Sequence, residues 1–191
     1  MKKVILASLL VLATSSAIEA RGGHFGHGWG YYHHNGYNRG FQNSVISELT
    51  QKQKDDLIFM YQEEKLARDV YITLGKKWGS RVFLNIQRSE QRHMDAIKRL
   101  LDKYSLKTPV PNDNIGTFKN EELQALYNEL IAKGNLSLKD ALEVGVTIEE
   151  TDIADLEEKI DGAPSDIVRV YNRLLRGSYN HLRAFNANLG K

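Results

Sequence analysis

The stretch Arg88–Leu101, RSEQRHMDAIKRLL, carries an acidic residue and an imidazole three positions apart, Glu90 and His93. In an α-helix this spacing places both side chains on one face. The same face is apolar, because hydrophobic residues recur along it at helical spacing. A carboxylate among core residues is unfavourable unless it has a partner. The stretch therefore predicts a buried polar site that needs partners from elsewhere in the chain, and a metal ion held by several helices is one answer. The apolar residues of this face are Phe83, Ile86, Met94, Ile97, Leu100 and Leu101.

Length and composition limit the classes of protein that need to be considered. The 191 residues suffice for one domain with a sizeable core and some accessory sequence. The formal net charge is +2, and no basic stripe in the sequence indicates nucleic-acid binding. The absence of cysteine excludes thiolate catalysis, disulfides, iron–sulfur clusters and thiolate zinc sites. Any metal must therefore be held by oxygen and nitrogen atoms.

The N-terminus has the pattern of an export signal. Lys2 and Lys3 precede an apolar run, Val4–Ala13, and small residues follow as far as Ala20. The run is too short to span a bilayer as a mature helix. We expect residues 1–20 to be a cleaved signal peptide and the mature protein to be periplasmic or secreted, without a membrane segment. The alternative is a buried N-terminal helix.

Residues 21–43 form a Gly-, His- and Tyr-rich segment without helical or strand periodicity, which we expect to be a disordered arm. Two interpretations of its histidines remain open. They capture copper, nickel or zinc, since imidazole suits those ions, or they are incidental residues of a flexible tether. These histidines are His24, His27, His33 and His34.

The remaining residues, 44–191, show helical periodicity interrupted by short breakers and no strand-like alternation. The pattern predicts an all-α bundle of four long helices, with a short helix in the crossover between the second and third. The long helices are expected at about residues 50–74, 81–104, 137–160 and 165–186, and the short one at about 120–133.

Local signals predict where the helices begin and end. The first is expected to start near Ser47 or at Thr50, where Gln53 completes a capping box. Gly75 and the KKWGS stretch that follows are expected to end it. Ser137 is the expected cap of the third long helix.

The other three long helices also carry polar residues in their apolar stripes. A single glutamate at such a position is usually a boundary residue that reaches solvent, but four helices sharing the feature are harder to attribute to chance. In addition, only His93 and His181 lie outside the arm, and both fall on these stripes. Glu63, by contrast, is rotated off its stripe and is predicted to face solvent. The polar stripe residues are Glu64 in the first helix, Glu149 and nearby Asp152 in the third, and Ser178 and His181 in the last.

A bundle core with this pattern can bind two metal ions. Two helices each contribute one glutamate, and the other two each contribute Glu-x-x-His. Carboxylates then bridge the ions, so the buried charges compensate one another.

Four stretches resemble the ferritin-like superfamily and, more closely, its DUF2202 family. They are EEKLARDVY (63–71), SEQRHM (89–94), GVTIEETDIADLE (145–157) and LLRGSYNHLRAF (174–185). The resemblance spans about residues 50–187, and the first two stretches are also similar to rubrerythrins. It implies a ferritin-like four-helix bundle.

The resemblance also implies a ligand set. Glu64 takes the ligand position of the first helix, Glu90 and His93 those of the second, and Glu149 that of the third, with Glu150 as the alternative.

The last helix departs from the family pattern, because Ser178 stands where the second Glu-x-x-His would begin. Three outcomes remain open. Asp152 substitutes for the missing carboxylate, Ser178 holds a water ligand, or only one ion binds.

Three functions are compatible with these residues. The first is an exported ferritin-like protein that binds iron or manganese through Glu64, Glu90, His93, Glu149 and His181. If it is redox-active, the resemblance implies oxidation of iron(II) by oxygen or peroxide, or detoxification of peroxide. Zinc or copper would also bind such ligands. Tyr71 and Tyr61 would then be candidate electron relays, or simply core residues. The second function is a non-catalytic metal-binding or carrier module. The third is a metal-free helical interaction protein, with its glutamates paired to Arg68, Arg92 or Arg176.

Overall fold

The computed structural model describes residues 48–110 and 113–191. The predicted signal peptide, the arm and the alternative helix start at Ser47 lie outside these ranges. Within them the chain has five helices and no strand, which confirms the all-α prediction. None of these helices is both long enough and apolar enough to cross a membrane. The helices are α2 (Gln51–Trp78), α3 (Arg81–Lys103), α4 (Glu121–Gly134), α5 (Leu138–Ile160) and α6 (Ser165–Leu189).

The predicted N-terminal caps are present. Thr50 and Gln53 form the capping box of α2, in which each side chain accepts a hydrogen bond from the other residue's backbone N–H. Ser137 caps α5 by accepting from the backbone N–H of Asp140 at 3.0 Å. These local hydrogen bonds explain why the helix starts were readable from sequence.

The predicted end of the first helix is confirmed for the KKWGS stretch, where α2 ends at Trp78, but wrong for Gly75, through which the helix continues. The cap is Gly79 instead, with a left-handed φ of 61°. Gly75 serves close packing, since a Cβ there would lie 3.0 Å from Cβ of Phe83 on α3. Gly75 is thus a packing residue within α2, although in sequence a glycine at this position is also typical of a helix end.

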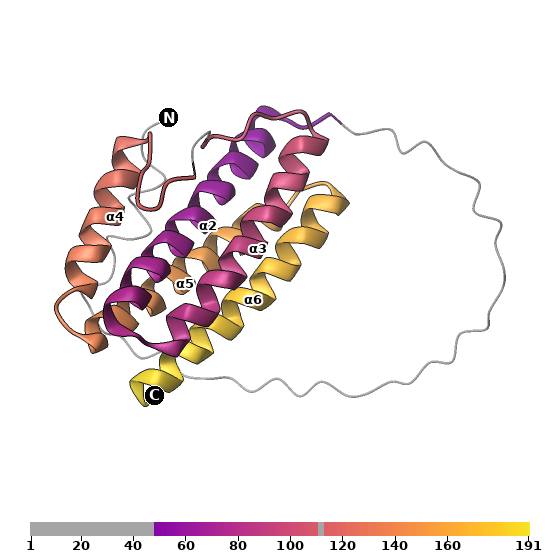
Figure 1. The fold of residues 1–191 in the computed structure, drawn as a ribbon. Helices are drawn as coiled ribbons and strands as arrows, with labels where there is room; N and C mark the ends of the chain where they lie inside the picture. The colour runs from indigo at the N-terminus through magenta and orange to yellow at the C-terminus, as the bar shows by residue number, and fades with distance from the viewer. Residues whose placement is uncertain (1–47, 111–112) are drawn as a thin grey trace, which may run out of the picture.

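The four long helices pack side by side (Figure 1). α2 contacts α3 and α5, whereas α6 contacts α5 and α3, so α2 and α6 occupy opposite corners. Short links join α2 to α3 and α5 to α6 as antiparallel pairs, and residues 104–137 cross over between the pairs. α4 lies in this crossover and packs on α5 and α2, so no helix of the described residues covers the α3–α6 side.

The hydrophobic core consists of two clusters with a polar layer between them. One includes Tyr71, Phe83 and Phe185. The other includes Met60 and Leu101. Along each long helix, the polar stripe residues predicted from sequence fall between the two clusters. The bundle therefore places the polar residues of all four helices at one level.

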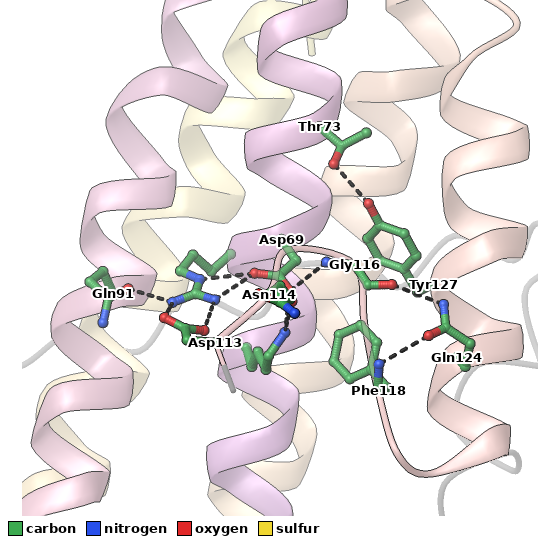
Figure 2. A network of polar contacts seen from close by, with 11 residues as sticks. Asp69, Thr73, Gln91, Asp113, Asn114, Gly116, Phe118, Gln124 and Tyr127 are labelled. Carbon is green, nitrogen blue, oxygen red and sulfur yellow. Dashed lines mark hydrogen bonds and ion pairs between the residues drawn. The ribbon is translucent and has the colours of Figure 1, made fainter. Parts of the chain in front are cut away.

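A buried ionic network attaches the start of the crossover to α2 (Figure 2). Asp69, which is fully buried, forms ion pairs with Lys65 and Arg68 and accepts a hydrogen bond from the backbone N–H of Gly116 at 2.9 Å. Arg68 also pairs with Asp113. Asp69 thus joins Lys65 and Arg68 of its own helix to the crossover segment at Gly116.

Candidate metal centre

Seven polar side chains from four helices form the layer between the two apolar clusters. None is more than 8% exposed. α2 supplies Glu64, α3 supplies Glu90 and His93, α5 supplies Glu149 and Asp152, and α6 supplies Ser178 and His181.

Glu90 lies at the centre of this layer. Its Oε2 atom is 2.9 Å from Nδ1 of His93, and its Oε1 atom is 2.8 Å from Nδ1 of His181. The two imidazole rings face each other in a stacked arrangement, with centroids 5.5 Å apart. One carboxylate therefore contacts both histidines, through a different oxygen in each case.

Two potential ligand groups share Glu90. The first combines Glu90 with Glu64 and His93, and the second combines it with Glu149 and His181. In each group the ligand atoms lie within 4.8 Å of one another. His93 Nδ1 is 3.2 Å from Glu64 Oε2, and His181 Nδ1 is 3.4 Å from Glu149 Oε2. The arrangement can hold cations at two adjacent positions.

Asp152 occupies the space opened by the serine of α6. The Ser178 hydroxyl lies 2.5 Å from Asp152 Oδ2 and donates to it, and its oxygen is also 3.1 Å from the Leu174 carbonyl. Because serine is short, the carboxylate of the neighbouring helix fits beside it. The contact brings Asp152 to the place of the missing glutamate, although neither of the two ligand groups that share Glu90 includes it.

Several buried atoms of the layer make no aligned hydrogen bond with the described residues. They are Glu64 Oε1, Glu90 Oε1, Asp152 Oδ1 and His181 Nδ1. Buried polar atoms nearly always have a partner. A cation among these carboxylate and imidazole atoms would satisfy all four, so the donor set fits a metal ion.

The family model described as "Uncharacterized protein domain (DUF2202)" matches residues 53–191. The chain belongs to the DUF2202 family. This DUF2202 chain is also similar to the uncharacterized protein MJ0754 of Methanocaldococcus jannaschii, with 53% identity over 138 residues, which cover 72% of this chain and 75% of that protein.

Two solved structures are similar in fold. The crystal structure of hypothetical protein MJ0754 superposes with a TM-score of 0.72 at 52% identity, covering 74% of this chain and 82% of that one. A DUF305 fragment from Deinococcus radiodurans superposes with a TM-score of 0.55 at 16% identity, covering 74% and 97%. The second likeness concerns the fold alone.

Gly177 of the DUF2202 chain is a residue of the site that the sequence analysis missed. A Cβ at this position would lie 2.6 Å from Nε2 of His93. Glycine therefore makes room on α6 for an imidazole from α3. The only sequence signal is a glycine inside a helix one residue before Ser178, where it weakens the helix.

We expect Gly177→Ala to weaken metal binding about tenfold or more, because the methyl group displaces His93. Competition with a chromogenic chelator would measure the affinity. Alanine raises helix propensity by about 1 kcal/mol relative to glycine, so a substitution without effect on the site would stabilise the protein. A more stable variant with unchanged affinity would contradict this role for Gly177.

The electrostatics of the metal-free layer depend on burial and on the carboxylate–imidazole contacts. Burial, reinforced by Glu90, raises the pKa of Glu149 to about 8, and burial raises that of Asp152 to about 6. Burial opposes ionisation of Glu90 as well, but His181 and His93 lower its pKa to about 2. Although burial lowers the pKa of His181, its contacts with Glu149 and Glu90 raise that pKa to about 10. Protons thus balance part of the negative charge when no cation is bound.

The metal-free protein is expected to lose stability as the pH rises from about 5 to 9. Glu149 and Asp152 have higher pKa values in the folded protein than in the unfolded chain, where they are near 4. Their protonated forms therefore stabilise the fold fully below pH 4, and this stabilisation is lost as the pH rises through the folded pKa of each group. His181 acts in the same direction between its ordinary value of 6.5 and about 10. The lowered pKa of Glu90 acts oppositely, but only below 4.5.

Urea unfolding of metal-free protein across this pH range would measure the loss, which linkage puts at about 1.4 kcal/mol per pH unit for each group that is protonated in the folded state alone. Glu149→Gln is expected to flatten the profile because it removes one titrating group. Stability that stays constant or increases over the range would contradict the prediction.

The Tyr71 hydroxyl reaches the level of the candidate ligands. It donates to Oε1 of Glu149 at 2.7 Å, so it orients one candidate ligand. Tyr61, the other predicted relay, lies in the apolar cluster on the far side of the layer from Tyr71. Its charged neighbours include Asp113 and Arg68 of the crossover network.

The prediction that Glu63 faces solvent is only partly right, because the residue is half-buried. Its Oε2 atom is enclosed and accepts no hydrogen bond from the described residues, and burial together with Asp155 and Asp152 raises the pKa of Glu63 well above the usual range. Asp155 itself is paired with Lys159 at 2.7 Å. The reason is that α2 contacts α4 and α5 as well as α3, so more than one flank of the helix is covered.

The arginine pairings suggested for a metal-free scaffold are also wrong. Arg92 and Arg176 are exposed, and the guanidinium of Arg68 binds Asp69 and Asp113. Between the two candidates on α5, Glu149 is buried in the layer and Glu150 is exposed. The layer glutamates therefore have histidines, and not arginines, as their cationic neighbours.

Proposed function

We propose that this DUF2202 protein binds iron or manganese in a ferritin-like centre with two adjacent metal positions. The observation that carries the proposal is the central position of Glu90, whose two oxygens contact different histidines and which belongs to both ligand groups. A bridging carboxylate would have these relations to its neighbours. The single glutamates of α2 and α5 and the Glu-x-x-His of α3 support the same assignment, whereas α6 contributes His181 without the glutamate of that pattern.

The charge of the layer supports two divalent ions. Four buried carboxylates, those of Glu64, Glu90, Glu149 and Asp152, carry four negative charges when ionised. Two divalent cations with neutral imidazoles would balance them, which removes the penalty of buried uncompensated charge. Asp152, positioned by Ser178, would replace the carboxylate absent from α6.

Carboxylate oxygens with imidazole nitrogen suit non-haem iron or manganese, although zinc and copper also bind such ligands. Iron or manganese bound here would supply redox chemistry with dioxygen or peroxide. The protein's own residues would hold the ions, and hydrogen bonds from Tyr71 and Ser178 would orient Glu149 and Asp152.

Metal analysis of the full chain with the four arm histidines replaced by alanine would test the proposal. We expect about two iron or manganese ions per chain, and substantial loss in His93→Ala and Glu149→Ala variants. Glu150→Ala is the matched control, because this exposed neighbour should leave the metal content unchanged. A folded protein without bound metal would refute the proposal.

Mixing the iron(II)-loaded protein with dioxygen or peroxide in a stopped-flow instrument tests the redox part separately. A fast change in absorbance that disappears in His93→Ala would support oxidation at this centre. Stable metal binding without a fast phase would instead identify a binding or carrier module.

We also propose that residues 1–20 direct export and are removed, which rests on their charged, apolar and small-residue sequence. N-terminal sequencing of protein from the periplasmic or extracellular fraction would test this. A mature protein that retains Met1 would contradict it.

A further inference from the structure

A basic groove runs between α3 and α6 on the side of the bundle that α4 leaves uncovered. Its cavity measures about 280 Å³, close to the lower end of the range for small-molecule sites. Four cationic side chains line it, Arg99 and Lys103 from α3 and Arg169 and Arg173 from α6. Each pair is spaced by four residues, so both members lie on one helix face.

Only one of the four cations has an acidic partner in the part of the chain that the structure describes. Lys103 pairs with Asp166 at 2.6 Å. The three arginines form no ion pair with any described residue, and each is exposed. The groove therefore concentrates about three uncompensated positive charges in a chain whose formal net charge is only +2.

The cations and the apolar surface between them suggest the chemistry of a ligand. Like charges gathered in one groove repel one another, and an anion between them would reverse that effect. Arginine presents a planar fork of donors that matches phosphate oxygens in a bidentate manner. Leu100, Val170 and Leu174 provide an apolar surface between the charges, suited to a carbon skeleton or to the arginine stems.

We propose that the α3–α6 groove binds a phosphate-bearing anion through Arg99, Arg169 and Arg173. The site is separate from the metal centre and does not depend on it. A free phosphate compound and the headgroup of an anionic lipid share this chemistry, so the experiment has one arm for each source.

Isothermal titration of the metal-free full chain with pyrophosphate tests the first source, and flotation with phosphatidylglycerol vesicles against neutral phosphatidylcholine vesicles tests the second. The proposal predicts saturable binding to at least one probe that weakens as salt increases. Arg99→Gln/Arg173→Gln is expected to weaken that binding about tenfold or more, because two charge-assisted contacts are lost.

The matched control is Arg81→Gln/Arg183→Gln. It removes the same charge from the same two helices at exposed positions that do not line the groove, and it should retain binding. Pyrophosphate binding would identify a soluble ligand, and vesicle binding alone would identify a lipid headgroup. The proposal is overturned if neither probe binds, or if the control pair weakens binding as much as the groove pair.

Discussion

Asp69→Ala is expected to destabilise the protein by about 3–5 kcal/mol, the typical penalty for breaking a buried ion pair. The substitution leaves Lys65, which is fully buried, without its carboxylate partner and removes the acceptor for the Gly116 backbone N–H. Arg68 would retain Asp113. Urea unfolding of the wild type and the variant, both in the same metal-free buffer, measures the difference in their free energies of unfolding.

Asp55→Ala is the control for this substitution, because Asp55 lies on the same helix but is exposed. Its effect should stay within about 0.5 kcal/mol. We also expect faster proteolysis in residues 104–120 of the Asp69 variant, since the network attaches this part of the crossover to α2. A loss below about 1 kcal/mol would mean that the network contributes little to holding the crossover.

Glu90→Gln is expected to abolish binding at both metal positions, whereas Glu64→Gln and Glu149→Gln should each affect mainly one. The reason is that Glu90 belongs to both ligand groups, while each of the others belongs to one. Glutamine keeps the shape of the side chain but removes the negative charge that a bridging ligand needs. Metal-to-protein ratios of the three variants, measured in the background without arm histidines, would show the difference.

A second readout for Glu90→Gln needs no metal. In the metal-free protein the pKa of His181 is raised by its contacts with Glu149 and Glu90, so removal of one carboxylate should lower it. NMR titration of the imidazole signals measures this shift. Retention of a full metal complement by Glu90→Gln would contradict the bridging role, and an unchanged His181 titration would contradict the contact itself.

The positions of the helices and of the polar layer could be predicted from sequence because both depend on local order. Helical periodicity identifies the buried stripe of each helix without knowledge of its neighbours. Glu64, Glu90 and Glu149 interrupt those stripes at positions that meet at one level once the helices pack. Capping at Thr50 and Ser137 involves residues within three positions, so these helix starts were readable as well.

Other features were decided only when the helices packed together. Periodicity shows one buried face per helix, but α2 also touches α4 and α5, and this contact buries the Glu63 carboxylate. The pairing of Ser178 with Asp152 joins two helices whose register no local pattern specifies. Gly75 and Gly177 likewise serve contacts with α3 that a single helix does not reveal.

The basic groove is the clearest case of such a feature. The spacing of Arg99 with Lys103 and of Arg169 with Arg173 is visible in sequence, but no local pattern shows that the two pairs face each other, and the net charge of +2 conceals the concentration. The sequence by itself determined the helices, their apolar faces and the polar residues within them, because these follow from neighbours three or four positions apart. The tertiary structure alone determined which flanks are covered and which charges from separate helices lie together, because both depend on how the four long helices pack.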